Sequence, residues 1–177
     1  MSLTIFVFGL VLAYGALTGA AQTPVLEQRT QSFTLALNAP VGHATPLFGP
    51  VCESEWAPDW SPHFIHPAYG VQREGVVFTT ANGGGRERLW LLTTYDVKNG
   101  RVEYVATTPA LVTSEVRIRV APDGDQHCKA TITYRRSALA LEGNREVTNL
   151  DARWAEQQRI HWEMAINEAL AKRDTHD

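Results

Sequence analysis

The sequence predicts an α+β domain in which one curved antiparallel sheet packs against a long C-terminal helix. Short strand patterns joined by hairpin turns run from Gly70 to Tyr134, and one long amphipathic stretch, Asn144 to Lys172, closes the chain. A single curved sheet cannot cover its own concave face, so we expect the helix to cover it. Such a pair of elements usually leaves a cavity, and the pattern therefore predicts a domain that encloses an apolar molecule.

The composition indicates one globular domain without a strongly charged surface. Of the 177 residues, 44% are hydrophobic and 20% are charged, and the formal net charge is -3. These values are typical of a domain with a substantial core. They provide no positive field for nucleic acid or acidic lipid, so we expect no nucleic-acid partner.

The first 21 residues differ from the rest of the chain. No charged side chain precedes Glu27, and Leu3 to Leu17 is mostly apolar and is followed by small residues up to Ala21. This pattern predicts a signal peptide at residues 1–21 and a periplasmic or secreted protein. An uncleaved membrane anchor is the alternative, because about 20 apolar residues span a bilayer. A misplaced start codon, with a cytoplasmic protein, is the third interpretation.

The folded domain is expected over residues 31–173, after a linker at residues 22–30. Polar and apolar residues alternate from Gln31 to Leu37, which predicts a half-buried first strand. A short helix is expected within Val41 to Gly49. The prolines of the next segment, Pro50 to Pro67, exclude a long helix or a central strand, and its large rings indicate a lid over one end of the core.

Five further strands are expected in the middle of the chain. The Asn99-Gly100 pair predicts a tight hairpin between two of them, because both residues accept positive φ. In the last two of the five, polar and apolar residues alternate, which predicts one buried and one exposed face. The second of the five is apolar on both faces. The five are Gly75 to Thr80, Arg88 to Val97, Arg101 to Thr107, Val112 to Val120 and Cys128 to Tyr134.

One continuous helix is predicted from an N-cap at Asn144 to Lys172. Arg159–Glu163 and Glu168–Lys172 have the spacing of ion pairs on its outer face. The stripe expected to meet the sheet contains Val147, Leu150, Trp154, Gln158, His161, Ala165 and Ala169.

Gln158 and His161 are the strongest functional candidates, because they are the polar members of that stripe. A polar group removed from water without a partner costs about 1–3 kcal/mol, so each needs a partner in the sheet, a water molecule or a ligand. Two interpretations follow: a core histidine bonded to a strand, or a pair that binds the polar end of a ligand in the cavity.

Large aromatic rings are the second candidate group. They occur on the lid and on the strands, an arrangement suited to clamping a flat or oily ligand. Ordinary core packing is the alternative. The candidate rings are Trp56, Trp60, Phe64, Phe78, Trp90 and Tyr104.

Histidines and cysteines provide no metal motif. His63 and His66 have the spacing of a ligand pair, but no further ligand lies nearby in the sequence, so we expect no metal and no cofactor. Cys52 and Cys128 form no CxxC pair. The sequence allows a disulfide between them, although the position of Cys128 in a strand favours a buried thiol.

Two other patterns suggest chemistry only superficially. Glu53 and Glu55 flank the tryptophan segment and have the chemistry of an acid or base, but solvated or ion-paired carboxylates are far commoner. The turn from Asn82 to Arg86 is rich in glycine, yet it joins two strands and lacks the helix N-terminus that a phosphate site uses.

Several of these segments together resemble the START-like helix-grip superfamily, known as SRPBCC. The resemblance is carried by Phe33 to Pro40, Leu47 to Pro50, Glu55 to Trp60, Gly75 to Thr79 and Trp162 to Leu170. The sequence looks most like small bacterial members of unassigned activity.

This resemblance implies a β-α-α-β6-α order and a seven-stranded sheet wrapped on the last helix, with a hydrophobic tunnel between them. The superfamily includes lipid carriers, polyketide cyclases and hormone receptors, so the fold alone does not define an activity. It has no universal catalytic residue to transfer to this chain.

Three functions are consistent with the sequence. The first is binding or carriage of a small apolar or amphipathic ligand, with Gln158 and His161 at its polar end. The second is a cyclase or dehydratase that uses His161 as general acid or base. The third is an envelope or stress protein whose cavity is filled by its own side chains. The expected partner is a small hydrophobic molecule, and membrane association through residues 1–21 stays open.

Overall fold

The computed structural model describes residues 25–82 and 85–175, and the predicted signal segment lies outside them. Seven strands form one antiparallel sheet: β1 (Gln28–Leu37), β2 (His63–His66), β3 (Val77–Asn82), β4 (Arg86–Asp96), β5 (Arg101–Thr108), β6 (Val112–Pro122) and β7 (Cys128–Ala138). The helical elements are α1 (Val41–Ala44), the 3-10 helices η1 (Thr45–Phe48) and η2 (Cys52–Glu55), α2 (Gly143–Thr148) and α3 (Ala152–Asp174).

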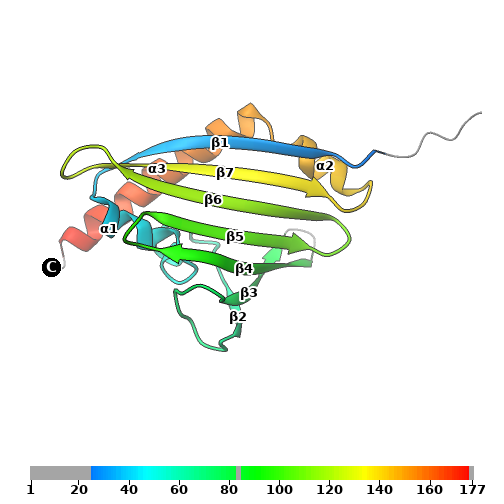
Figure 1. The fold of residues 1–177 in the computed structure, drawn as a ribbon, viewed down its shortest axis with the longest axis horizontal. Helices are drawn as coiled ribbons and strands as arrows, with labels where there is room; N and C mark the ends of the chain where they lie inside the picture. The colour runs from blue at the N-terminus through cyan, green and yellow to red at the C-terminus, as the bar shows by residue number, and fades with distance from the viewer. Residues whose placement is uncertain (1–24, 83–84, 176–177) are drawn as a thin grey trace, which may run out of the picture.

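The strands lie in the order β1-β7-β6-β5-β4-β3-β2. Figure 1 shows the curved sheet with α3 lying diagonally across one face, and β2 and β3 turning away from the plane of the other strands. This is the α+β architecture that the sequence predicts, and it has the seven strands and the short helical turns after β1 that the resemblance implies. β1 begins at Gln28, so the last part of the expected linker belongs to the first strand.

The sheet has one face toward α3 and one outer face, as the alternation in the last two strands predicts. Val116, Ile118 and Ile132 are buried on the face toward α3. On the outer face, Glu115 of β6 pairs with Arg135 of β7. Polar side chains on one face and apolar ones on the other are what an antiparallel sheet with one solvated side requires.

Strand β4 is apolar on both faces, as the sequence indicates, but only one of these faces is buried. Leu92 is fully buried, but Leu89 and Leu91 are 44% and 39% exposed on the outer face. A short edge strand, β2, was not predicted. It is only four residues long and lies between Pro62 and Pro67, in a segment whose prolines exclude a central strand but allow an edge strand.

The expected single C-terminal helix is wrong, because the chain forms two helices. α2 ends at Thr148, and α3 begins after Asp151, whose carboxylate accepts a hydrogen bond from the backbone N–H of Trp154 (2.8 Å). Asp151 is therefore the N-cap of the long helix, not Asn144. Leu150 is fully buried at the break, so the apolar stripe continues although the helix does not.

Helix α3 also covers the open edge of the sheet. Glu163 accepts a hydrogen bond from the backbone N–H of Ala36 (2.8 Å), and the Asn167 side chain donates to the carbonyl of Ala36 (3.0 Å) and accepts from the N–H of Asn38 (2.9 Å). These bonds satisfy the edge of β1. The ion pairs Arg159–Glu163 and Glu168–Lys172 are present as predicted. Within residues 25–82 and 85–175, no helix has the length and hydropathy needed to span a bilayer.

Candidate functional site

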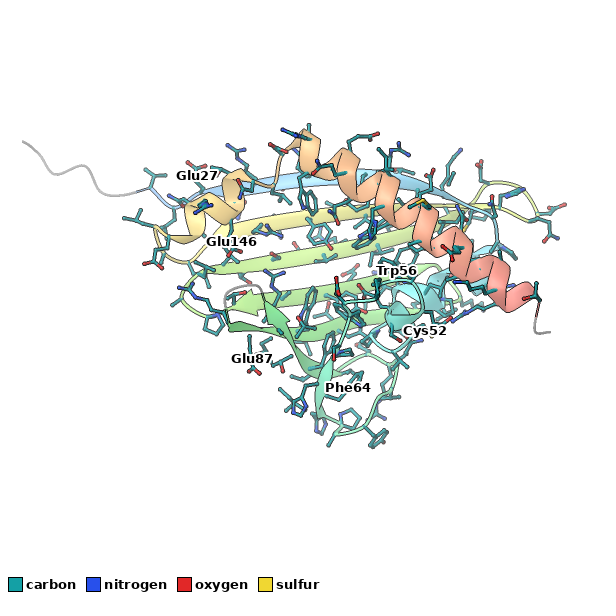
Figure 2. All side chains as sticks on the ribbon, turned by 180° about the vertical axis from the view of Figure 1, so that it is seen from behind. Glu27, Cys52, Trp56, Phe64, Glu87 and Glu146 are labelled. Carbon is teal, nitrogen blue, oxygen red and sulfur yellow. The ribbon has the colours of Figure 1, made fainter. Side chains whose placement is uncertain are left out.

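The segment from Pro50 to Trp60, here called the lid, packs between α3 and the strands β2 and β3. Figure 2 shows Cys52 and Trp56 of the lid in this position, with Phe64 on the neighbouring strand β2. The lid contains η2, a single 3-10 turn in which side chains three residues apart lie on the same side. Two faces therefore result, one carrying Glu53 and Trp56 and the other carrying Cys52 and Glu55.

The polar edges of the lid tryptophans are used to hold the backbone. The indole N–H of Trp56 donates to the carbonyl of Leu47 (2.7 Å), and that of Trp60 donates to the carbonyl of Pro50 (2.8 Å). Because these N–H groups are occupied, both rings contribute mainly carbon surface to the region between lid and helix.

The lid is also fixed from both sides. The amide oxygen of Gln72 accepts from the backbone N–H of Cys52 (2.9 Å), and its amide nitrogen donates to the hydroxyl of Tyr95 (3.0 Å). At the end of α3, Arg173 donates two hydrogen bonds to Glu55 (2.7 and 2.6 Å), and these bonds lower the pKa of Glu55. The expectation of an ion-paired Glu55 is confirmed.

Two hollows meet beneath the lid. The inner cavity, between lid, sheet and α3, has a volume of about 20 Å³, which is room for about one water molecule. The outer cleft is open, has a volume of about 350 Å³, and runs between the lid and α3. The inner cavity is lined by Phe48, Glu53, Trp56, Trp90, Tyr104, Val116, Ile118, Tyr134 and Trp162. The outer cleft is lined by Glu53, Trp56, Ala57, Pro58, Asp59, Trp60, Gln158, His161 and Trp162.

Glu53 is one of three residues that line both hollows, together with Trp56 and Trp162. Its carboxyl makes no hydrogen bond or ion pair with another residue in the described part of the chain. Burial among these rings disfavours the charged form and raises the pKa of Glu53 to about 8. At neutral pH the group is therefore mostly a neutral carboxylic acid, able to donate and to accept a hydrogen bond.

Two tyrosines of the sheet reach the same inner cavity. Burial, and after it the negative charge of Glu53, raises the pKa of both Tyr104 and Tyr134. The Tyr104 hydroxyl donates to the carbonyl of Phe48 (2.7 Å) and is thereby fixed. The Tyr134 hydroxyl has no hydrogen-bond partner among the residues that the structure describes. Glu53 and Tyr134 are thus the two polar groups of the inner cavity whose side chains can still form hydrogen bonds with a ligand.

Comparison with known proteins agrees with this architecture. By sequence, no family model and no curated protein matches the chain significantly. By structure, the chain is similar to norcoclaurine synthase from Thalictrum flavum, with a TM-score of 0.63 and 12% identity over 86% of this chain and 99% of that one. The fold is the helix grip.

Two further helix-grip structures extend this likeness. The ZhuI aromatase/cyclase from Streptomyces sp. R1128 has a TM-score of 0.61 and 12% identity over 83% of this chain and 96% of that one. Ara h 8.0201 has a TM-score of 0.54 and 13% identity over 85% of this chain and 100% of that one. The fold implied by the resemblance to the START-like superfamily is confirmed.

The helix grip brings together most of the predicted ring cluster. Trp60 packs edge-on against Phe78 (5.7 Å between centroids) and Trp90 (5.6 Å), and Phe78 also contacts Phe64 (5.8 Å). Tyr104 meets Phe78 and Trp90 at right angles. Phe64 and Phe78 line neither hollow, so their role in this arrangement is to support the rings that do.

Trp56 lies in a second group of rings. It packs against Trp162 of α3 with centroids 4.9 Å apart, and Trp162 contacts Phe33 of β1 at 5.5 Å. Phe33 in turn contacts Trp154, which packs on Tyr134. The inner cavity therefore lies between two groups of rings, one centred on Trp90 and the other on Trp162.

Gln158 and His161 lie on the flank of α3 that borders the outer cleft, not on the face that meets the sheet. Gln158 is half-buried and His161 is exposed, so the expectation that both are buried against the sheet is wrong. The buried face of α3 is formed by Ala155, Ile166, Ala169 and Leu170, with Trp154, Trp162 and Ala165 packed at its margins, so Trp154, Ala165 and Ala169 of the predicted stripe do meet the core.

Tyr134 and Trp162 are site residues that the sequence prediction missed, and Glu53 was considered as an acid or base but assigned to the commoner solvated or ion-paired carboxylates. The useful signal was the three-residue spacing of Glu53 and Trp56, which places the carboxyl beside a ring that must be buried. Cys52 and Cys128 are both free thiols. In the described residues, no group of three or more His, Cys, Asp or Glu side chains has the arrangement of a metal site.

Proposed function

We propose that this protein binds a small aromatic or amphipathic molecule in the outer cleft, with the polar end of the ligand at Glu53. The observation that carries the proposal is the position of the Glu53 carboxyl. It lies where the cleft meets the inner cavity, and it makes no hydrogen bond or ion pair with another described residue. A half-buried carboxyl without a protein partner gains a hydrogen bond when a ligand arrives.

The dimensions of the cleft support this proposal. Small-molecule sites are concave, about 300–1,000 Å³ in volume, and mostly apolar with a few polar groups that fix orientation. The outer cleft has about 350 Å³, with Trp56, Trp60 and Trp162 as apolar walls. Gln158 and His161 provide polar contacts at its rim. The enclosed part is too small for a whole ligand, so the body of the ligand would lie in the cleft.

The helix-grip neighbours support a ligand of this class. One norcoclaurine synthase structure, 13% identical and with a TM-score of 0.59, was determined in complex with dopamine and hydroxybenzaldehyde, both aromatic molecules with polar substituents. That likeness concerns the fold, so the proposal for this chain depends on its own rings and carboxyl.

Binding is tested by titration with N-phenyl-1-naphthylamine, a neutral dye whose fluorescence rises in apolar sites. The wild-type protein is expected to bind the dye, and Trp60→Ala to bind it at least about fivefold more weakly, because one wall of the cleft is lost. Tyr69→Ala is the matched control, since this ring is 65% exposed and lies outside the cleft. Equal affinity in all three proteins would contradict the proposal.

A catalytic function is the second candidate, and the raised pKa of Glu53 favours it. A carboxyl that titrates near neutral pH is suited to general acid–base chemistry. This assigns to Glu53 the role that the sequence suggested for His161, which lies exposed at the rim.

The catalytic candidate is tested with 2-tetralone, an aromatic ketone whose carbon-bound protons next to the carbonyl exchange with D₂O. A base at Glu53 would remove such a proton and an acid would return a deuteron, so the wild-type protein is expected to accelerate exchange and Glu53→Gln is not. Equal rates measured by NMR in both proteins would leave ligand binding as the function.

Export through residues 1–21 stays a prediction. Sequencing of the mature N-terminus is expected to begin at Gln22, as the apolar run followed by small residues predicts. A protein that begins at Met1 and fractionates with the cytosol would contradict it.

A further inference from the structure

The charged side chains that line the two hollows are acidic. Among the residues that line the inner cavity and the outer cleft, Glu53 and Asp59 are acidic and none is lysine or arginine. Arg173, at the lid, is engaged with Glu55 on the opposite face of η2. Behind this lining, Arg88 lies over the Trp90 ring (5.9 Å) and pairs with Glu146 (3.8 Å), and Arg136 donates to the carbonyl of Glu146 (3.1 Å). An anionic ligand would therefore meet carboxyls at the surface of the site, whereas these two cations are engaged elsewhere.

The walls of the inner cavity have the chemistry that attracts a cation. Trp56, Trp90, Trp162, Tyr104 and Tyr134 surround it, and the faces of such rings carry negative potential. The Trp90 indole N–H donates to Thr80 (2.9 Å) and that of Trp56 to Leu47, so these two donors are not aimed at a ligand.

The size of the inner cavity restricts what enters it. Its volume of about 20 Å³ holds one non-hydrogen atom with its hydrogens, as a water molecule or a primary ammonium group has. A trimethylammonium group, with four non-hydrogen atoms, is too large. The adjoining cleft of about 350 Å³ has room for an aromatic or aliphatic body.

We propose that the site selects primary amines, with the ammonium group in the inner cavity beside Glu53 and the apolar body in the outer cleft. This rests on the proposed binding function and names its ligand class. The ammonium would donate to the Glu53 carboxylate and to the Tyr134 hydroxyl, the two groups with spare bonding capacity, and its third hydrogen would face the rings.

The other titratable groups that face this region set the conditions of the test. They are Tyr104 and Tyr134 on the sheet, Asp59 on the lid, and His161 on α3, and the guanidinium groups of Arg88 and Arg136 act on Tyr134 from the sheet. At about pH 8.5 a primary amine is still charged and the Glu53 carboxyl, with a pKa of about 8, is mostly ionised, so the ion pair is available at this pH.

The test compares 2-phenylethylamine with 2-phenylethanol, which has the same carbon skeleton and a neutral polar end, by calorimetric titration of the full protein at about pH 8.5. We expect the amine to bind at least about tenfold more tightly than the alcohol, because the ion pair and the cation–π contacts are available only to the amine. In Glu53→Gln this preference is expected to fall to about twofold or less, because the amide still forms hydrogen bonds but carries no charge. Asp59→Asn, at the cleft but not at the cavity, is the matched control and is expected to keep the preference.

Each outcome separates the two proposals. Equal binding of both compounds by the wild-type protein overturns amine selection and leaves the binding function intact. A preference that survives in Glu53→Gln overturns the assignment of Glu53 as its source. Failure of both compounds to bind counts against the binding function as well. The comparison of the two compounds in the wild-type protein needs no variant and is decisive even if Glu53→Gln fails to fold.

Discussion

Replacing Glu53 with glutamine is expected to make the protein more stable at alkaline pH. The pKa of Glu53 is about 8 in the folded protein, compared with 4.5 as the reference for an exposed carboxyl. Between these values the folded state keeps its proton, whereas the unfolded state releases it. The unfolded state therefore binds fewer protons, and the free energy of unfolding falls as the pH rises through this window.

The magnitude follows from the width of that window. Each pH unit between the two pKa values lowers the free energy of unfolding by about 1.4 kcal/mol, which gives an upper bound of about 5 kcal/mol above pH 8. Glu53 is half-buried and borders the open cleft, so partial solvation of the charged form reduces the effect to roughly 2–3 kcal/mol. Below the reference pKa, Glu53 is protonated in both the folded and the unfolded state. The folded state then loses no stability through this group, and glutamine gives no advantage.

The assay is urea denaturation followed by tryptophan fluorescence, at intervals from about pH 5 to about pH 9. The difference in unfolding free energy between Glu53→Gln and the wild type is expected to grow through this range and to level off above about pH 8. Glu74→Gln, which removes an exposed carboxyl before β3, is the control and should follow the wild type. A constant difference between Glu53→Gln and the wild type across the range would refute the assignment of a buried carboxyl.

Three further predictions concern the scaffold around the site. Arg173→Ala removes the ion pair with Glu55, and because the pair is partly exposed the free energy of unfolding should fall by less than about 1 kcal/mol. Amide exchange measured by mass spectrometry should nevertheless accelerate in η2, and unchanged exchange there would mean that the pair does not hold the lid. Tyr104→Phe leaves the carbonyl of Phe48 without its partner and should lower stability by about 1–2 kcal/mol in urea denaturation, whereas Tyr69→Phe should have no effect. Gly100→Ala should be destabilising by at least about 2 kcal/mol, because φ is +62° and the added Cβ would lie 2.1 Å from the carbonyl oxygen of Val120. Gly124→Ala, at φ +101° but in open space, should be milder, and equal losses at the two positions would show that the steric contact is unimportant.

The sheet could be predicted from the sequence because its strands obey a local rule. In β6 and β7 every second side chain enters the core, so alternation alone identifies both the strands and the buried face. The short strand β2 lacks such a signal. Four residues between prolines pair with β3 only because the lid holds them there, and that is a tertiary effect.

The break between α2 and α3 was missed for a related reason. Leu150 is as buried as Val147, so the apolar stripe runs through the break and conceals it. The local evidence was Asp151 at the position of an N-cap, which competed with the similar signal at Asn144. Because the stripe was continued from Val147 and Leu150 as if the helix were unbroken, the predicted sheet-facing side of α3 was rotated. His161 was therefore expected against the sheet, whereas it lies at the cleft.

The rings of the site were predictable and its carboxyl was not. Large rings are at least partly buried in most positions, so Trp56, Trp90 and Tyr104 were reasonable choices from residue type alone. A glutamate is usually solvated or paired, as Glu55 is. Glu53 differs from Glu55 only in which side of one 3-10 turn it occupies, and the consequence of that side depends on α3, which lies about a hundred residues later in the chain.

The account depends on a protonated Glu53 at the floor of a ligand site, and carbon-13 NMR of the side-chain carboxyl tests this directly. The resonance of Glu53 is identified by its loss in Glu53→Gln, and it is titrated with and without 2-phenylethanol. The account predicts a midpoint near pH 8 and a shift of the resonance when the compound binds. A midpoint near 4.5, with no response to the compound, would contradict it.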